Sequence, residues 1–261
     1  WHGYVVNADE ESIKDKFGIE TSDKDGVTET FEMLHYFIKM GGLTDRPDVI
    51  KLGDSIDLAS LTVDGANITK LKLIVVGINS FHLGRGGGEG KYAVTANDKV
   101  PHVVLQFEVS TGSRGMNTDA TNVGGYAGSE MRQYLIDKFL PGLVAAGVPE
   151  ELMWAPLRYV SDKGSGDGTV QDLLWLPTEW EILGGRSNSE SNYETAANQA
   201  WLEYYTTNTK RQKGGTYWLG SPASGDSNFC ATVNNGSLTT SSASTVQGVI
   251  PAFCIGYKPA P

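Results

Sequence analysis

Positive charge is scarce in this chain: Lys and Arg number 21 against 31 Asp and Glu, so the net charge is −10. Nucleic acids and anionic lipids attract proteins mainly through Lys and Arg, so this balance predicts neither as a partner. Long apolar runs are also missing, and no stretch approaches the roughly 18 residues that a membrane-spanning helix needs. The composition therefore argues against a nucleic-acid-binding domain and against a transmembrane segment.

Cysteine is nearly absent. The two that occur, Cys230 and Cys254, are too few for a structural zinc site, and a chain of 261 residues buries a core without metals or disulfides. Both lie in apolar runs typical of strands. They predict either a disulfide between paired strands or two separate buried thiols, and the pattern slightly favours the thiols. No basic residue stands beside either cysteine, which argues against a catalytic thiolate.

Residues suited to hydrolysis lack the usual arrangements. Ser221 precedes Pro222 and does not occupy a nucleophile elbow. Glu179, Glu181 and Asp172 lie near aromatic residues, as the carboxylate pair of a glycosidase does, but a helix-capping role explains Glu181 more simply. No metal-binding spacing occurs among the four histidines, which are His2, His35, His82 and His102. Enzyme chemistry is therefore the less favoured interpretation.

Two glycine-rich segments are candidate ligand loops. The loop at Gly84–Gly90 follows an apolar run, as a phosphate-binding loop does, but neither a Lys-Ser/Thr pair nor an amphipathic helix follows it. The segment Asp162–Gly168 offers two carboxylates to Ca²⁺, yet it lacks the later Glu of an EF-hand. Exposed turns are favoured at both places. No cofactor is predicted, and Ca²⁺ stays open as the one alternative.

Hydrophobic periodicity predicts helices around β-rich regions. Helices are predicted at Val27–Met40, from Ser129 to Phe139 with an interruption at Pro141-Gly142, at Thr178–Leu183 and at about 193–205. Strands are predicted at Val49–Val63, Leu71–Ile78, His102–Val109, Leu157–Val160, Asp172–Leu176 and Val249–Ile255. Thr178 with Glu181 fits a capping box. The predicted organisation is an N-terminal helical segment over residues 1–47, packed on a main domain over residues 48–261.

The carboxyl-terminal region is β-rich and polar. Tyr217–Leu219 and Phe229–Val233 have the pattern of strands, and Asn234-Asn235-Gly236 is a hairpin-turn sequence because Asn and Gly tolerate positive φ. Between Ser221 and Gln247 nearly every residue is small and polar, and Asp226 carries the one charge. Hydroxyl and amide side chains both donate and accept hydrogen bonds, which suits recognition by loops held on an apolar framework.

Three segments resemble a known family. Leu174-Trp175-Leu176-Pro177-Thr178-Glu179-Trp180-Glu181 is similar to a segment of formylglycine-generating-enzyme-like domains, a branch of the C-type-lectin fold. The run from Gly124 to Leu135 and the ending from Trp218 to Ile255 are similar to a bacterial domain family of unknown function, common in surface proteins. The resemblance covers roughly residues 48–257. It implies an α+β fold, in which a twisted antiparallel sheet carries two flanking helices and long loops.

The same resemblance implies a ligand surface on the terminal strands and loops. Some members, including treponemal variable proteins, are diversified by retroelements that mutate adenines in one stretch of the gene, and residues 223–247 have the composition this leaves. Gly220 and Ile250 depart from the family, which commonly has Arg at the first place and Arg or Ala at the second. Cys230 and Cys254 lack the close spacing that formylglycine-generating enzymes use in copper-dependent oxidation, so that activity is not implied.

We therefore expect a bacterial recognition protein, adhesin-like or receptor-binding, with a protein or carbohydrate ligand. The start at Trp1-His2-Gly3 suggests a trimmed product, and we expect it at the cell surface or outside the cell. Trp218 is expected in the core. The alternatives are an enzyme, either a glycan hydrolase or an oxidase relative, and a structural module of a phage tail or surface fibre. The expected contact residues are Tyr217, Gly220, Asp226, Asn228, Thr232, Asn234, Thr239, Ser241 and Thr245.

Overall fold

The fold is α+β and contains two larger sheets. The computed structural model describes residues 11–81, 100–161, 167–189 and 200–258. The first sheet has six strands in the order β1-β2-β3-β13-β5, with β8 also paired to β13, and all its pairings are antiparallel. Its strands are β1 (Ser55–Val63), β2 (Ala66–Ile78), β3 (His102–Phe107), β5 (Met153–Trp154), β8 (Leu174–Trp175) and β13 (Ala252–Gly256).

The second sheet has five strands in the order β11-β10-β9-β12-β4, so β11 and β4 form its edges. Within this sheet, β12 pairs with β9 in a short parallel ladder, and the other pairings are antiparallel. Its strands are β4 (Ser113–Arg114), β9 (Tyr217–Pro222), β10 (Phe229–Asn234), β11 (Ser237–Ser242) and β12 (Gln247–Gly248). A separate ribbon pairs β6 (Arg158–Ser161) with β7 (Asp167–Val170).

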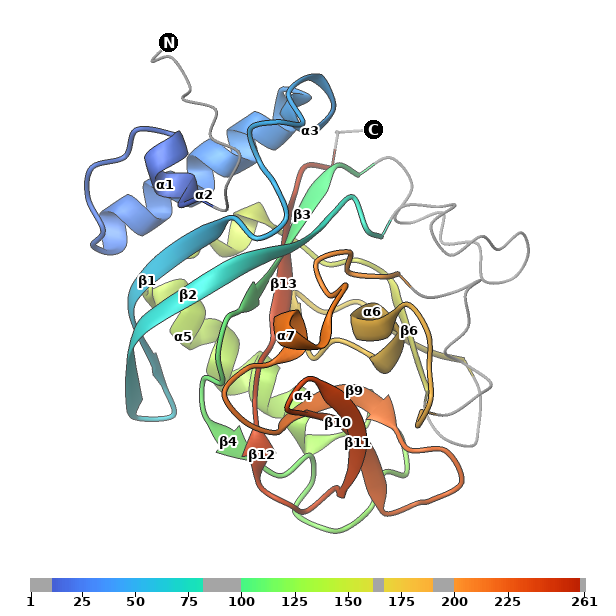
Figure 1. Cartoon of the computed structure of the whole chain (residues 1–261). Coiled ribbons are helices and arrows are strands. Elements are labelled where there is room, and N and C mark those ends of the chain that lie inside the picture. Colours follow the sequence, from blue (N-terminus) through green and yellow to red (C-terminus); the bar gives the residue numbers. More distant parts are fainter. Residues whose placement is uncertain (1–10, 82–99, 162–166, 190–199, 259–261) are drawn as a thin grey trace.

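The N-terminal helices cover one end of the first sheet (Figure 1). They are α1 (Ile13–Lys16), α2 (Lys24–Lys39) and α3 (Gly42–Asp45). The Asp23 side chain caps α2 by accepting from the Gly26 N–H, and the helix buries an apolar stripe that includes Phe31 and Leu34. Phe31 contacts Phe253 of β13, with ring centroids 6.1 Å apart. The N-terminal segment therefore shares the hydrophobic core of the strands that follow it.

A second helical region runs without a break from α4 (Glu130–Tyr134) through a π-helical turn (Leu135–Phe139) into α5 (Leu140–Ala145). The predicted interruption at Pro141-Gly142 is wrong. Pro141 comes just after the π-helical turn, and the helix continues through it into α5. Gly142 lets α5 approach β1, because a Cβ there would collide with the Thr62 carbonyl oxygen.

The remaining short elements include a 3₁₀ turn (Glu150–Leu152), α6 (Glu179–Leu183) and α7 (Asn208–Arg211). The capping box at Thr178 and Glu181 is confirmed. The predicted helix at about 193–205 is wrong over residues 200–205. There the Leu202 N–H donates to the Glu181 carbonyl oxygen and the Tyr204 N–H to that of Val76, so these groups form no helical hydrogen bond. The rest of that prediction lies outside the described residues.

Several strands are confirmed with altered ends. The strand predicted at Val49–Val63 begins only at Ser55, because Asp54 instead folds the preceding residues into a turn by accepting from the Lys51 N–H. Cys230 in β10 and Cys254 in β13 belong to different sheets, and both thiols are buried without a disulfide. The helices within the described residues all fall short of the length and hydropathy of a membrane span.

Candidate functional site

The β10–β11 hairpin carries much of the predicted contact face. Its turn residues, Asn235 and Gly236, have φ angles of 52° and 82°, which are the positive values that a two-residue hairpin turn requires. The two strands pair without a register shift from Asn234↔Ser237 to Phe229↔Ser242. The hairpin predicted from Asn234-Asn235-Gly236 is therefore confirmed.

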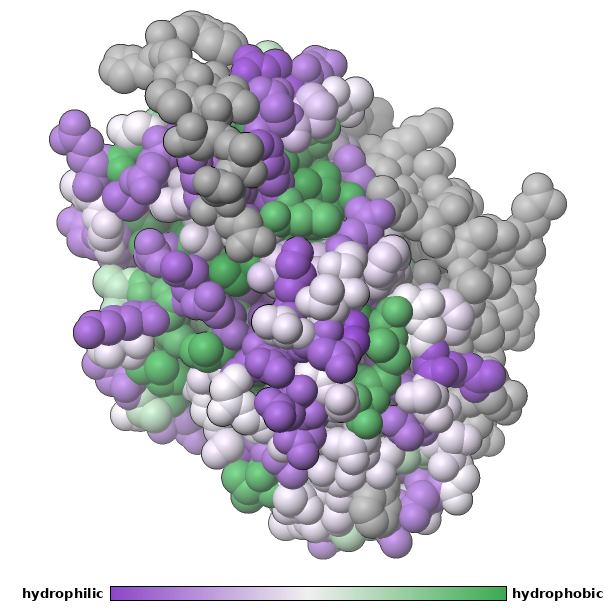
Figure 2. Space-filling model, viewed as in Figure 1, coloured by the Kyte–Doolittle hydropathy of each residue, from purple (hydrophilic) through white to green (hydrophobic). Residues whose placement is uncertain are grey.

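Six of the nine predicted contact residues reach the surface of the described structure. Asp226, Asn228, Asn234 and Thr245 are exposed, and Thr239 and Ser241 are half-buried. Figure 2 shows the lower part of this face mostly in the pale, intermediate colours of the hydropathy scale. Thr239 and Ser241 project on the same side of the hairpin, because they lie two residues apart on β11.

Three predicted contact residues are buried, and their assignment to the contact face is wrong. Tyr217 is 1% exposed and donates its hydroxyl hydrogen bond to the Arg211 carbonyl oxygen. Thr232 is fully buried because it lies in the middle of the sheet, between Trp218 and Thr239. Gly220 is also buried, and a Cβ there would lie 2.7 Å from the Leu176 carbonyl oxygen.

Trp218 lies in the core, as expected. Its side chain is fully buried, and the indole Nε1–H donates to the carbonyl oxygen of Arg114 over 2.8 Å. This hydrogen bond joins the central strand β9 to the edge strand β4. Trp218 thus satisfies its one polar atom internally and stabilises the sheet beneath the exposed residues.

Three loops meet at one end of the second sheet. The Asn117 N–H donates to the Ala243 carbonyl oxygen, the Ala243 N–H donates to the carbonyl oxygen of Asn228, and the Asn122 N–H donates to that of Ser227. The Asn122 side chain adds a bond from Nδ2 to the Asp226 carbonyl oxygen over 2.7 Å. We call the exposed residues of these loops the three-loop surface: Thr118, Asp119, Ala120, Val123, Ser224, Gly225, Asp226, Ser227, Asn228, Ser244, Thr245 and Val246.

Sequence reasoning missed the contribution of residues 117–123 to this surface. The segment Asn117-Thr118-Asp119-Ala120-Thr121-Asn122 has the same small, polar composition as the carboxyl-terminal tract, and this was the available signal. Its position beside residues 224–228 depends on hydrogen bonds between segments about a hundred residues apart, which a linear pattern does not reveal.

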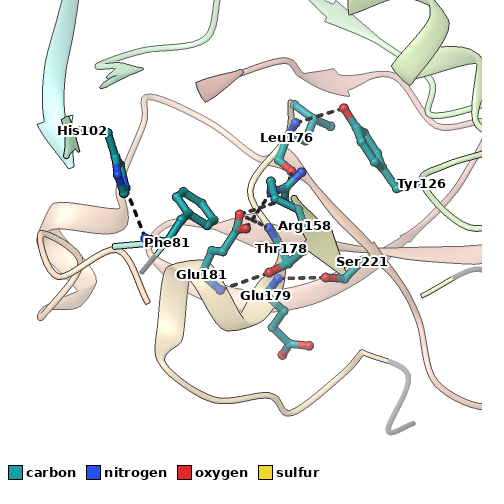
Figure 3. Close-up of polar contacts among 9 residues, drawn as sticks. All are labelled: Phe81, His102, Tyr126, Arg158, Leu176, Thr178, Glu179, Glu181 and Ser221. Carbon is teal, nitrogen blue, oxygen red and sulfur yellow. Dashed lines mark hydrogen bonds and ion pairs between the residues drawn. The ribbon is translucent and has the colours of Figure 1, made fainter. Parts of the chain in front are cut away.

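Beneath the second sheet lies a buried ion pair between Arg158 of β6 and Glu181 of α6 (Figure 3). Arg158 donates from Nε and Nη2 to the two carboxylate oxygens over 2.8 and 2.9 Å, and Nη2 also reaches the Leu176 carbonyl oxygen. The Thr178 N–H donates to Glu181 Oε2. This network joins β6, the segment after β8 and the first turn of α6, so it fixes the base on which β9 lies.

Glu179 is the second buried carboxylate, and Figure 3 shows it pointing away from Arg158. It accepts backbone N–H groups from Ser187, Asn188 and Ser189 over 2.5–3.2 Å. Its own N–H donates to the Ser221 hydroxyl over 2.8 Å, which links α6 to the end of β9. Glu179 and Glu181 are therefore buried and fully engaged, which supports their interpretation as structural residues.

His102 is fully buried at the start of β3. Its Nδ1 lies 2.8 Å from the Val100 carbonyl oxygen, and its Nε2 accepts the Phe81 N–H over 3.2 Å (Figure 3). Since an Nε2 that accepts a hydrogen bond carries no proton, these contacts require the neutral imidazole with its hydrogen on Nδ1. His102 thus holds the segment that follows β2 against the start of β3.

Burial also shifts the pKa values of Lys213 and Cys254. Desolvation lowers the pKa of Lys213 to about 8, while Glu108 opposes the shift, and the Lys213 ammonium donates to the Phe107 carbonyl oxygen over 3.2 Å. Burial raises the pKa of the Cys254 thiol, and the Glu181 carboxylate raises it further. Cys254 is therefore an inert thiol within the core.

No group of three or more His, Cys, Asp or Glu side chains is placed to hold a metal ion within the part of the chain that the structure describes. The two loops considered for phosphate and Ca²⁺ fall on residues 84–90 and 162–168. The first lies outside the described residues, as do positions 162–166 of the second.

Comparison with known proteins identifies a family for the region that contains both the three-loop surface and its base. Residues 101–257, more than half of the chain, match a family described as a domain of unknown function, DUF6273. The chain belongs to the DUF6273 family. Within the first sheet, the DUF6273 region supplies β3, β5, β8 and β13, and β1 and β2 extend that sheet from outside the region. Neither a curated protein nor a solved structure matches the chain.

Proposed function

We propose that this protein recognises a macromolecular ligand through the three-loop surface and the adjoining β10–β11 hairpin. The observation that carries the proposal is the alternation between exposed and buried side chains along residues 228–245. Asn228, Asn234 and Thr245 are exposed, whereas Ala231, Val233 and Ala243 between them are fully buried. Backbone positions are thus fixed by the core while the polar side chains are presented to solvent, which limits the entropy lost on binding.

The chemistry of this surface favours neutral hydrogen bonding. Asp119 and Asp226 are the charged residues of the three-loop surface, and its other polar residues are Ser, Thr and Asn. Such groups donate and accept without the desolvation penalty of a full charge. Val123 and Val246, which are 66% and 63% exposed, add apolar contact area to the same three-loop surface.

We further propose that the fold is C-type-lectin-like, of the formylglycine-generating-enzyme type, and that the protein acts at the bacterial surface. The paired sheets, the helix over residues 130–145 and the carboxyl-terminal hairpin support this interpretation. Retroelement diversification of residues 223–247 belongs to the same proposal. Sequencing gene copies from related strains tests it: substitutions concentrated at exposed positions of this tract support diversification, and substitutions spread evenly along the gene contradict it.

The binding experiment removes exposed amides that make no side-chain hydrogen bond within the described structure. The wild-type chain is screened against immobilised glycans and displayed random peptides, and the binders are titrated against the double variant Asn228→Ala/Asn234→Ala. We expect about a tenfold loss of affinity. The control is Asn67→Ala on the distant β1–β2 hairpin, an exposed amide whose Oδ1 accepts from the Thr62 hydroxyl over 3.4 Å, and this variant should bind unchanged. Equal binding by all three proteins would contradict the proposal.

A further inference from the structure

The outer edge of β11 presents backbone hydrogen-bonding groups without partners. In a hairpin closed by a two-residue turn, the closing pair exchanges both of its hydrogen bonds, and the pattern then alternates. Asn234↔Ser237 is that pair, so Ser237, Thr239 and Ser241 bond inward to β10, and Leu238, Thr240 and Ser242 face outward. Ser242 uses its carbonyl oxygen to accept from the Thr245 N–H. The N–H and C=O groups of Leu238 and Thr240 have no partner among the described residues.

This edge lacks the usual protection against pairing. Edge strands are commonly guarded by charged side chains, Pro or bulges. Residues 237–242 include no charged residue and no Pro, and their register with β10 is unbroken. The β1 edge of the other sheet differs, because Asp57 is exposed there and Ser55 is bridged to Ser12. The open edge of β11 is therefore a local property of this hairpin.

Both ends of β11 are held in place. At the turn, Arg211 Nε donates to the Gly236 carbonyl oxygen over 3.0 Å, and Gly236 lies directly against the Asn208 backbone of α7. Beyond the other end, Ala243 is fully buried and bonded to Asn117 and Asn228. The strand is thus ordered before any partner arrives, so pairing with it requires ordering of the partner alone.

We propose that the ligand of this surface is an extended polypeptide segment that adds to β11 as a sixth strand of the second sheet. The inference rests on the function proposed above and names the class of ligand. Outward N–H and C=O groups recur on β11 every second residue, about 7 Å apart, and the backbone of an extended peptide repeats at the same spacing. Half-buried Leu238 offers an apolar neighbour, and the net charge of −10 favours a segment that carries Lys or Arg.

The test removes one outward N–H and leaves the inner ladder intact. Thr240→Pro does this, because Thr240 faces Ala231 at a position that makes no hydrogen bond across the hairpin. Thr240→Ala is the matched control, since it changes the side chain and keeps the N–H. Peptides enriched from a displayed random library on the wild-type chain are synthesised with and without N-methyl groups on alternate residues. Affinities are measured by calorimetry, and amide exchange is followed by NMR.

We expect Thr240→Pro and peptide N-methylation each to lower affinity by about tenfold or more, with Thr240→Ala close to wild type. The amides of Leu238 and Thr240 should become protected from exchange when peptide binds. Equal binding of peptides to Thr240→Pro would overturn strand addition, and so would a library that yields no peptide binder. A glycan bound through Asn228 and Asn234, with Thr240→Pro unaffected, would overturn strand addition while supporting the recognition function. If Asn228→Ala/Asn234→Ala binds both peptides and glycans as well as wild type does, that result would instead count against the recognition function.

A second copy of the chain is the competing occupant of the β11 edge. Gel filtration and sedimentation of wild type and Thr240→Pro distinguish it from a foreign peptide. We expect both proteins to be monomeric at micromolar concentration. A wild-type dimer that Thr240→Pro abolishes would assign the edge to self-association and overturn the peptide assignment.

Discussion

The β1–β2 and β10–β11 hairpins have the same turn conformation but differ in the charge of their exposed side chains. Asp64 and Gly65 turn the first with φ angles of 50° and 81°, nearly the values at Asn235 and Gly236. Both hairpins end at a sheet edge. The first pairs exposed Asp57 with Lys72 across its strands, whereas β11 of the second has no charged residue and, apart from Leu238, consists of Ser and Thr. A hairpin with this turn can therefore carry charged side chains on its strands. The turn does not explain why β11 is neutral, and we propose that ligand recognition does.

The largest predicted effect concerns the base of the second sheet, on which β9 lies. Glu181→Ala leaves the Arg158 guanidinium buried without its counterion, and we expect the free energy of unfolding to fall by about 3–5 kcal/mol in urea titrations. The double variant Arg158→Met/Glu181→Leu replaces the whole pair by apolar side chains and should recover much of this loss. If Glu181→Ala alone proves neutral, the ion pair does not support β9 and the hairpin in the way described.

Gly65 and Gly236 occupy the same position in the turns of the two hairpins but have different surroundings. Gly236→Ala places a Cβ against the Asn208 backbone in addition to the strain of positive φ, and we expect a loss of about 3 kcal/mol. Gly65→Ala meets open space at the same turn position and should cost about 1 kcal/mol. Thermal unfolding of the two variants measures the difference. Equal losses would show that α7 does not hold the second hairpin in place.

The buried Lys213, beside the second sheet, should make the free energy of unfolding depend on pH. Its pKa falls from 10.5 to about 8 on folding, so between these values the unfolded chain binds more protons than the folded chain. The free energy of unfolding therefore rises with pH through this window. Lys213→Met should remove that rise and stabilise the protein near neutral pH by about 2 kcal/mol. Urea titrations at several pH values measure both, and a variant with an unchanged slope would contradict the burial of this ammonium.

Charge added at the surface should have the smallest effect on stability. Asn228→Lys on the three-loop surface and Asn67→Lys on the first hairpin change exposed side chains, so each should alter the free energy of unfolding by about 0.5 kcal/mol or less. Only Asn228→Lys should weaken ligand binding. The comparison between the hairpins fails if the two variants bind ligand equally well.

Local signals in the sequence predicted much of the carboxyl-terminal half. Asn234-Asn235-Gly236 fixed the turn of the second hairpin, and Thr178 with Glu181 fixed the start of α6, because both act over a few residues. Trp218 was correctly expected in the core. These successes share one cause: each feature depends on neighbours in the chain, so a linear pattern contains it.

The errors arose where distant segments decide the outcome. Tyr217 and Thr232 are polar enough for a surface, yet they lie in strands covered on both sides within a five-stranded sheet. The loop at residues 117–123 joined the candidate site through hydrogen bonds to residues 226, 227 and 243. Pro141 continued a helix because a π-helical turn precedes it. A single sequence specifies these arrangements through packing, which periodicity does not describe.

A hydrogen–deuterium exchange footprint of the wild-type chain, with a ligand selected in the screens, shows directly whether the three-loop surface and the β10–β11 hairpin bind that ligand. We expect new protection in residues 224–246 and in the loop at 117–123, with the β1–β2 hairpin unchanged. Protection confined to β1 and β2, or to any region that leaves residues 224–246 exchanging as before, would contradict the proposed recognition.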